Sequence, residues 1–236
     1  MVDKQAHGHF QHQQMEQMTK KSAMKAVIFD MDGVIIDSCN LWKQAEYEVF
    51  SSVGVKLSDE LCKITESMTT SEVSRFWFDR NPWQGKSLAE IEKAVIKRVA
   101  CLVEEEGKAI DGIEELIKNL KLNGYKIGLA TNSPSALIPV VLEKLKLKHY
   151  FDAVSSAEHE LEGKPDPSVY RSVIRKLGMK PGSCIAVEDS LTGLQAAKKA
   201  GKKTVALVKD HADFRDQAII DCTITCYKKL DFSLLG

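Results

Sequence analysis

One stretch constrains this chain more than any other. Four apolar residues at 26–29 run directly into Asp30, Met31, Asp32 and Gly33. A short apolar run rich in β-branched and aromatic residues is typical of a buried strand. Asp30 then falls at the carboxyl end of that strand, and Asp32 lies just beyond it, where the chain turns. Because open α/β sheets bind ligands at this end of their strands, the stretch predicts a functional site.

Two carboxylates at this spacing repel each other unless a positive charge lies between them. Hard oxygen ligands of this kind favour Mg²⁺. A carboxylate held beside Mg²⁺ can attack a phosphoryl group and form an aspartyl phosphate. A second acid can protonate the leaving oxygen and later deprotonate water. A pair of aspartates is also typical of a turn or helix cap, so the pair alone leaves both interpretations open.

Composition indicates an ordinary globular protein that acts on a small molecule. Among 236 residues, 33 are acidic and 33 basic, and no basic excess points to nucleic acid or an anionic membrane. No apolar run approaches the ~18 residues of a membrane span. The six cysteines lack the paired spacing of a zinc site, so we expect reduced thiols in a cytoplasmic protein. We also expect a monomer.

The pattern of apolar residues divides the chain into three parts. Residues 1–24 are rich in Gln, His and Met, which predicts a disordered N-terminal extension. Residues 25–38 and 109–236 alternate strand and helix patterns, which predicts an α/β core with a Rossmann-like parallel sheet and helices on both faces. Residues 39–108 show helical periodicity without a clear strand, which predicts a small all-helical domain inserted after the first strand.

Three further polar sites follow apolar strands or stand in a stiff loop. Thr131 and Asn132 precede a predicted helix, where backbone N–H groups can bind phosphate oxygens. Lys164 is flanked by Gly163 and by prolines that fix its loop. A lysine held in place in this way can bind a phosphate through its ammonium group. Asp189 ends another strand and can complete a Mg²⁺ shell. Each residue also has an ordinary interpretation when taken singly. Thr131, Asn132 and Asp189 could belong to the N-terminus of a helix, and Lys164 could be a solvent-exposed lysine.

In order along the chain, the four motifs resemble those of the haloacid dehalogenase superfamily. They are the segments 30–38, 131–133, 163–167 and 187–190, which read DMDGVIIDS, TNS, GKPDP and VEDS. The resemblance covers about residues 25–230. It implies a phosphoric monoester hydrolase with Mg²⁺ as cofactor. It also implies that the helical insert is a cap that closes over the substrate and excludes water.

The same resemblance implies roles for particular residues. Asp30 would be the nucleophile and Asp32 the general acid and base. Thr131, Asn132 and Lys164 would bind the substrate phosphate.

The resemblance also implies a metal site. Asp30, the backbone carbonyl of Asp32, and Asp189 would bind Mg²⁺. Glu188 would act behind these ligands by holding them in place.

Two reactions fit the resemblance, and a third hypothesis lies outside catalysis. The stretch from Asp37 to Trp42 looks like bacterial phosphatases that act on 2-deoxyglucose 6-phosphate and hexitol phosphates. We therefore expect hydrolysis of a small sugar or polyol phosphate. The alternative is a β-phosphoglucomutase-like mutase, but that branch has histidine where this chain has Trp42. A non-catalytic sensor of a phosphorylated ligand is the third hypothesis.

Aromatic residues in the helical insert allow two interpretations. Trp77 and Trp83 could stack on a sugar face, and Arg80 could hold a hydroxyl group or a distal charge. Tryptophans in a small helical unit are more often its hydrophobic core, and we favour that interpretation. The segment 66–70 lacks the arginine that many members of the superfamily carry there, so the sequence does not define the substrate.

Overall fold

The computed structural model describes residues 25–66, 68–208 and 217–230. The expected disorder of residues 1–24 lies outside these ranges. The described strands form one six-stranded sheet in the order β3-β2-β1-β4-β5-β6, and every neighbouring pair is parallel. The strands are β1 (Ala26–Phe29), β2 (Lys126–Thr131), β3 (Ala153–Ser156), β4 (Cys184–Glu188), β5 (Lys203–Leu207) and β6 (Cys222–Ile224).

The strand order reverses beside β1. The chain passes from β1 to β2 and β3 on one side and then crosses to β4 on the other. Such a reversal opens a crevice at the carboxyl ends of the two strands. Phe29 is in register with Leu129 and with Val187. Asp30, the next residue, therefore lies level with Glu188, and its backbone N–H donates to the carbonyl of Val187 at 3.0 Å.

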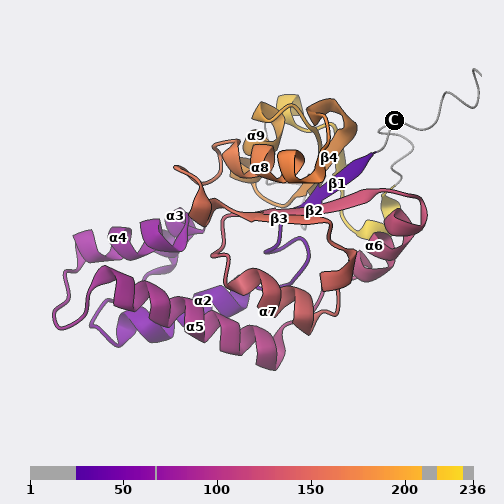
Figure 1. Cartoon of the computed structure of the whole chain (residues 1–236). Helices are drawn as coiled ribbons and strands as arrows, with labels where there is room; N and C mark the ends of the chain where they lie inside the picture. Colours follow the sequence, from indigo (N-terminus) through magenta and orange to yellow (C-terminus); the bar gives the residue numbers. More distant parts are fainter. Residues whose placement is uncertain (1–24, 67, 209–216, 231–236) are drawn as a thin grey trace, which may run out of the picture.

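Helices cover both faces of the sheet, which confirms the predicted α/β architecture (Figure 1). Val27 and Phe29 pack toward the helices on one face, and Ile28 packs toward those on the other. The first face carries α6 (Ile113–Leu122) and α7 (Leu137–Lys144), and the second carries α8 (Ser168–Leu177) and α9 (Leu191–Lys199). Single 3₁₀ turns are η1 (Lys148–Tyr150), η2 (Ala157–His159), η3 (Pro181–Ser183), η4 (Gln217–Ile219) and η5 (Tyr227–Lys229).

Four helices lie together beside the sheet (Figure 1). They are α2 (Cys39–Ser51), α3 (Asp59–Thr65), α4 (Thr70–Arg80) and α5 (Leu88–Glu106). Their aromatic rings form a core, in which the ring of Phe50 lies 6.2 Å from Trp77 and 6.1 Å from Trp83. Both tryptophans are buried, and Arg80 stacks on the ring of Phe76. The sugar-stacking interpretation of these residues is therefore wrong, because their side chains are used in packing.

The chain leaves and re-enters the α/β core at one place. Ile36 and Ala109 form an antiparallel bridge. The N–H of Asp37 donates to the carbonyl of Lys108, and that of Ile110 donates to the carbonyl of Ile35, each at 2.9 Å. The two connections to the four-helix segment therefore run side by side, as expected for a segment inserted after β1.

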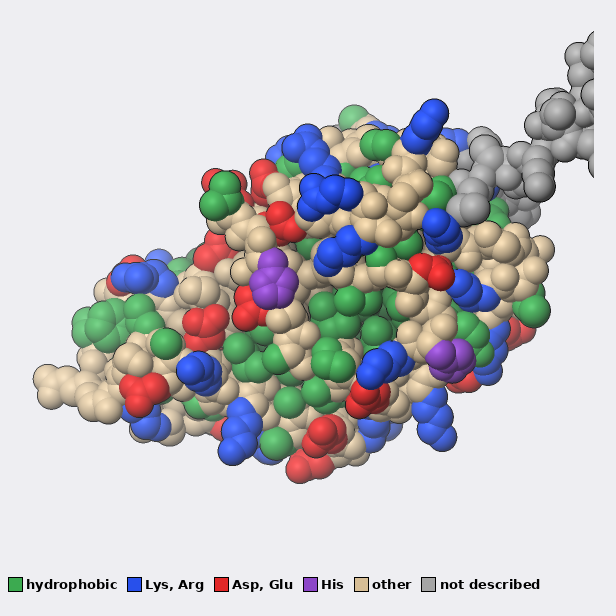
Figure 2. Space-filling view, in the orientation of Figure 1, with side chains coloured by type: hydrophobic (Ala, Val, Ile, Leu, Met, Phe, Trp, Pro, Cys, Tyr) green, Lys and Arg blue, Asp and Glu red, His purple; other side chains and the backbone are tan. Residues whose placement is uncertain are grey.

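The surface carries charges of both signs. On the face seen in Figure 2, basic and acidic side chains occur over the core and over the helical segment. Within the described ranges, the helices are too short or too polar to span a membrane. No disulfide joins any of the six cysteines, all of which lie within the described ranges.

Candidate active site

A cavity of about 650 Å³ lies between the carboxyl end of the sheet and the helices α2 to α4. Its floor is formed by residues that follow β1, β2 and β4, together with Lys164 from the loop before α8. Its wall is formed by side chains of the four-helix segment. The floor residues are Asp30, Asp32, Thr131, Asn132, Ser133, Lys164 and Asp189. The wall residues include Trp42, Lys43, Glu46, Cys62, Thr65, Glu66 and Thr70. The cavity thus brings together residues that are more than 150 positions apart in the sequence.

Lys164 links two carboxylates on the cavity floor. Its ammonium group donates to Asp30 Oδ1 at 2.7 Å, to Glu188 Oε1 at 2.6 Å and to the carbonyl of Ala130 at 2.8 Å. These three bonds use all of its protons. Burial lowers the pKa of Lys164, but Asp30 and Glu188 outweigh this effect and raise it above the usual value. Lys164 is therefore a fixed positive charge beside Asp30.

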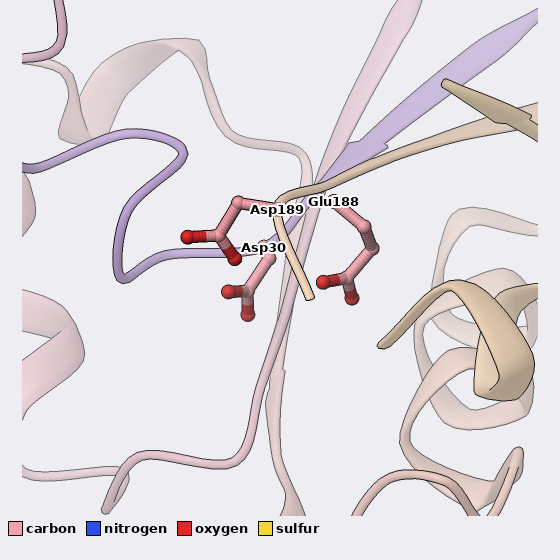
Figure 3. A group of neighbouring side chains, drawn as sticks. All are labelled: Asp30, Glu188 and Asp189. Carbon is pink, nitrogen blue, oxygen red and sulfur yellow. The ribbon is translucent and has the colours of Figure 1, made fainter. Parts of the chain in front are cut away.

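Asp30 lies among acidic side chains. Carboxylate oxygens of Asp30, Glu188 and Asp189 all lie within 4.8 Å of one another (Figure 3). Burial raises the pKa of Asp30 well above its usual value, and Lys164 opposes this rise. Burial, and next the charge of Glu188, raise the pKa of Asp189 to about 7. Two buried carboxylates and a partly buried one, with one ammonium group, leave an excess of negative charge, and a hard divalent cation such as Mg²⁺ fits this donor set.

The turn at Gly33 allows the approach of Asp189. Gly33 has a φ of +75°, and a Cβ atom there would overlap the carboxylate of Asp189. A residue other than glycine would be strained at this φ and would displace a predicted metal ligand. The glycine of the first motif is thus required on two grounds.

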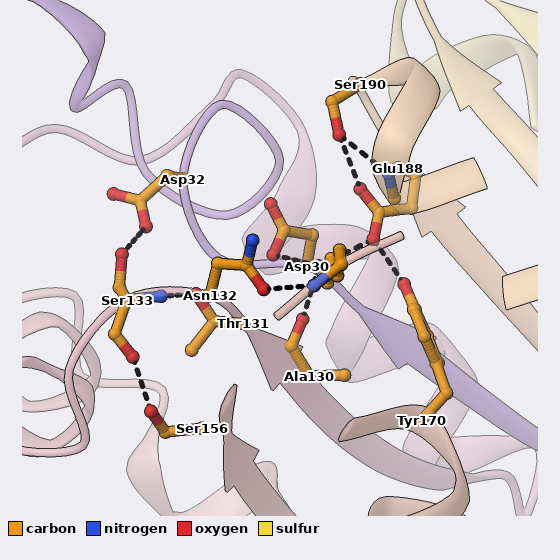
Figure 4. Close-up of polar contacts among 12 residues, drawn as sticks. Asp30, Asp32, Ala130, Thr131, Asn132, Ser133, Ser156, Tyr170, Glu188 and Ser190 are labelled. Carbon is orange, nitrogen blue, oxygen red and sulfur yellow. Dashed lines mark hydrogen bonds and ion pairs between the residues drawn. The ribbon is translucent and has the colours of Figure 1, made fainter. Parts of the chain in front are cut away.

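The side chain of Asp32 is held by donors from both sides of the cavity. Ser133 Oγ, after β2, donates to Oδ2 at 2.6 Å (Figure 4). Trp42 Nε1, in α2, donates to Oδ1 at 2.8 Å, and Ser38 Oγ donates to the same oxygen. The Asp32 carboxylate is absent from the acidic cluster of the described residues. The assignment of the Asp32 backbone carbonyl as a metal ligand stays a prediction.

Thr131 and Asn132 occupy the cavity floor at the end of β2. Thr131 Oγ1 accepts a hydrogen bond from the N–H of Ser133 at 3.0 Å and is almost fully buried. Asn132 Oδ1 accepts from the backbone N–H of Lys164 at 2.8 Å. Asn132 thereby ties the loop of Lys164 to β2, a positioning task that the sequence did not indicate. Phosphate binding by Thr131, Asn132 and Lys164 stays a prediction.

Sequence reasoning missed three contributors to the site. Tyr170 of α8 donates its hydroxyl proton to Glu188 Oε1, so that this carboxylate is held by Tyr170 as well as Lys164. Ser38 and Ser133 hold Asp32. The two serines stand inside motifs that were recognised, so their position was a usable signal. Tyr170 gave no signal, because only the docking of α8 on the sheet shows which of its faces points to β4.

Comparison with known proteins identifies the family. Residues 27–207 match the haloacid dehalogenase-like hydrolase family. Hexitol phosphatase B of Escherichia coli is 38% identical over 192 residues, which cover 80% of this chain and 86% of that protein. A phosphorylated carbohydrates phosphatase of Thermotoga maritima is 32% identical, with 75% and 82% covered.

Solved structures agree with this family. The crystal structure of CbbY from Rhodobacter sphaeroides in complex with phosphate has a TM-score of 0.79 and 26% identity, and the match covers 88% of this chain and 96% of that one. A putative β-phosphoglucomutase from Thermotoga maritima has a TM-score of 0.68 and 29% identity, with 85% and 94% covered. The chain therefore belongs to the haloacid dehalogenase-like hydrolase family. Within that family it is a phosphatase.

Proposed function

We propose that this protein hydrolyses the phosphate monoester of a small sugar or polyol, with Mg²⁺ as cofactor and an aspartyl phosphate as intermediate. The observation that carries the proposal is the contact between Asp30 and Lys164, which are 2.7 Å apart on the floor of a cavity that Asp32 also lines. The sugar or polyol is supported by similarity to the hexitol phosphatase and the carbohydrate phosphatase.

In the first step, a carboxylate oxygen of Asp30 attacks the phosphorus atom of the ester. The bond from phosphorus to the alcohol oxygen breaks, and Asp32 gives its proton to that oxygen. Lys164 and Thr131 bind the phosphoryl oxygens as negative charge moves onto them. The products of this step are the free alcohol and a phosphoryl group on Asp30.

In the second step, Asp32 accepts a proton from a water molecule, and the water oxygen attacks phosphorus. The bond to the Asp30 oxygen breaks, which returns the carboxylate and releases inorganic phosphate. Asp30, Asp189 and the backbone carbonyl of Asp32 would bind Mg²⁺, and Glu188 would hold Lys164 in place. When bound, Mg²⁺ supplies positive charge that offsets the phosphoryl and carboxylate charges.

We also propose that residues 39–108 act as a cap on a core of residues 25–38 and 109–236. The paired connections at 36–37 and 108–110 support this division, because they allow the helical segment to move as a unit. The free thiols are consistent with a cytoplasmic location. Trp42 favours hydrolysis over the mutase reaction, because an indole N–H donates a hydrogen bond but does not act as a base.

The proposal is tested by phosphate release from sorbitol 6-phosphate, 2-deoxyglucose 6-phosphate and a nucleoside monophosphate, with Mg²⁺ and with EDTA. We expect release from the sugar and polyol esters with Mg²⁺ and its loss in EDTA. Asp30→Asn should abolish release, while Asp79→Asn, an exposed aspartate of α4, should leave it unchanged. Brief incubation with labelled substrate should leave label on the protein that hydroxylamine removes, as expected for an acyl phosphate.

Two results would count against the proposal. Turnover retained by Asp30→Asn would refute the nucleophile assignment. Conversion of a sugar phosphate to an isomer without net release of phosphate would favour the mutase.

A further inference from the structure

The cavity wall formed by α2 and α3 carries a carboxylate without a partner. Glu46 of α2 lines the cavity and is partly buried. No hydrogen bond or ion pair joins its side chain to another described residue. Burial, and next repulsion from Glu66, raise the pKa of Glu46 to about 7. A carboxylate that lines the cavity without a protein partner can accept a hydrogen bond from a ligand bound there.

Glu46 lies on the part of the cavity wall that α2 forms. It follows Trp42 by four residues in α2, so both side chains lie on one face of the helix, with Cβ atoms about 5–6 Å apart. Trp42 is the residue whose indole contacts Asp32. Asp32 is the proposed proton donor to the alcohol oxygen, so the alcohol part of the ester would leave on the side of Asp32 and Trp42. A substrate with phosphorus at Asp30 would therefore place its alcohol part beside Glu46.

The other polar side chains on this part of the wall either have a partner within the protein or are exposed to solvent. Lys43 pairs with Glu66 at 3.2 Å near the rim, where both side chains are more than half exposed. Lys63 is exposed. The hydroxyl of Thr65 donates to a backbone carbonyl in its own helix at 3.0 Å. Within the described part of this wall, Glu46 is thus the partly buried polar group best placed to contact a substrate.

Building on the proposed function, we propose that Glu46 determines substrate specificity by accepting a hydrogen bond from a hydroxyl group of the alcohol part of the ester. The substrate class is then a phosphate monoester of a neutral sugar or polyol with a hydroxyl group several carbons from phosphorus. An ester with a carboxylate or a second phosphate at that position would bring a negative charge against Glu46. Such esters are selected against by repulsion rather than by size.

The test compares two probes that differ at one carbon. Sorbitol 6-phosphate and 6-phosphogluconate share their chain and stereochemistry, but one ends in a hydroxymethyl group and the other in a carboxylate. p-Nitrophenyl phosphate, which has no such hydroxyl group, reports the phosphoryl-transfer step alone. The kinetic constants are measured for the full chain with Mg²⁺, for wild type, Glu46→Gln, Glu46→Ala and Glu46→Lys. The control is Glu48→Gln, since Glu48 is on another face of α2 and pairs with Arg98.

We expect wild type to prefer sorbitol 6-phosphate. Glu46→Ala should lower kcat/KM for it by about 10-fold or more, mainly through KM, as expected for a lost hydrogen bond to a charged group. Glu46→Gln should lessen the preference, and Glu46→Lys should reverse it in favour of 6-phosphogluconate. The kcat/KM for p-nitrophenyl phosphate should fall much less than that for sorbitol 6-phosphate in every Glu46 variant, and its continued turnover shows that each variant is folded.

Other results separate failure of this inference from failure of the proposed function. An unchanged ratio between the two probes in all Glu46 variants, with p-nitrophenyl phosphate still hydrolysed, would overturn the role of Glu46 and leave the phosphatase intact. A change of equal size in Glu48→Gln would also overturn it, because the effect would then be one of general charge. Absence of release from all three compounds by wild type would overturn both.

Discussion

The indole Nε1 of Trp42 donates a hydrogen bond of 2.8 Å to Oδ1 of Asp32. Trp42 belongs to the helical segment, whereas Asp32 follows the first strand of the core. From the other side, Ser133 donates to Oδ2 at 2.6 Å. The proposed general acid and base is thus held between the two parts of the chain, so its position depends on how they are packed together.

Removal of the indole donor should harm the general acid step selectively. An alkyl phosphate needs a proton on its leaving oxygen, whereas the nitrophenolate leaving group does not. Since general acid catalysis contributes roughly 10²–10⁴-fold, we expect Trp42→Phe to lower kcat/KM for sorbitol 6-phosphate by at least 10-fold. The kcat/KM for p-nitrophenyl phosphate, which reports only the steps through release of nitrophenolate, should change much less. Steady-state assays of both substrates measure the difference.

Trp83→Phe is the matched control for this experiment. Its Nε1 donates to the carbonyl of Lys86 in the helical segment, away from the cavity. It should lower stability but leave the ratio of the two kcat/KM values unchanged. Equal loss on both substrates in Trp42→Phe would show that Trp42 supports the fold and does not position Asp32.

Replacement of Lys164 should destabilise the protein and make its stability depend more strongly on Mg²⁺. Lys164→Met removes the cation between Asp30 and Glu188 and leaves their carboxylates buried together. Loss of one partner of a buried ion pair destabilises by about 3–5 kcal/mol. We expect a lower Tm without metal and a larger rise in Tm on addition of Mg²⁺ than in wild type, measured by thermal unfolding with and without Mg²⁺.

A surface lysine provides the comparison. Lys121 pairs with Asp152 at 2.9 Å, and both side chains are about one-third exposed. Lys121→Met should change stability by no more than about 1 kcal/mol, with no dependence on Mg²⁺. If Lys164→Met showed the same small effect, the carboxylates of the floor would not need a cation, and the proposed metal site would be in doubt.

Gly193 should tolerate no side chain, although it lies in the first turn of a helix. Alanine in place of glycine usually stabilises a helix interior by about 1 kcal/mol. A Cβ atom at Gly193 would overlap the carboxylate of Glu188, which would have to leave Lys164 and Tyr170. We expect Gly193→Ala to lower both Tm and kcat. Gly182→Ala, where no atom lies within 4 Å of the added Cβ, should do neither.

The motif positions could be predicted because a parallel sheet fixes where strand ends lie. Asp30, Thr131 and Asp189 each follow an apolar run, and the structure brings all three to one cavity. The direction of each side chain could not be predicted in the same way. Asp32 bonds to Trp42, and the Glu188 carboxylate turns to Lys164. Both contacts depend on docking between segments that sequence periodicity treats separately.

The roles of three other side chains could not be settled from the sequence, because they depend on how the helical segment packs. Trp77 and Trp83 have the composition of a sugar-binding surface, but their side chains pack on Phe50 inside the helical segment. Glu46 reads in the sequence as one more solvated acid of an amphipathic helix, yet it lines the cavity. The helical nature of the segment was predictable, but the side chains that meet its core depend on the packing of α2, α4 and the loop after α4 against neighbours distant in the sequence.

Lys202, far from the site in the connection to β5, gives a prediction for stability and pH. It is 3% exposed, and its ammonium nitrogen is buried without a partner among the described residues. Burial lowers its pKa from 10.5 to about 8. Between these values the unfolded chain binds more protons than the folded one, so this residue makes stability rise with pH. Below pH 8 the residue is charged in both states, and its burial is least favourable.

Lys202→Met should therefore raise Tm at pH 7, since the methylene stem is kept and the buried charge is removed. The gain should shrink as pH rises from 8 toward 10, where wild-type Lys202 folds as the neutral amine. Thermal unfolding of both proteins at pH 6.5, 8 and 9.5 measures this difference, and comparison at equal pH cancels the titration of other groups. A constant difference in Tm across the three values would show that the ammonium group finds water or a partner in the folded protein.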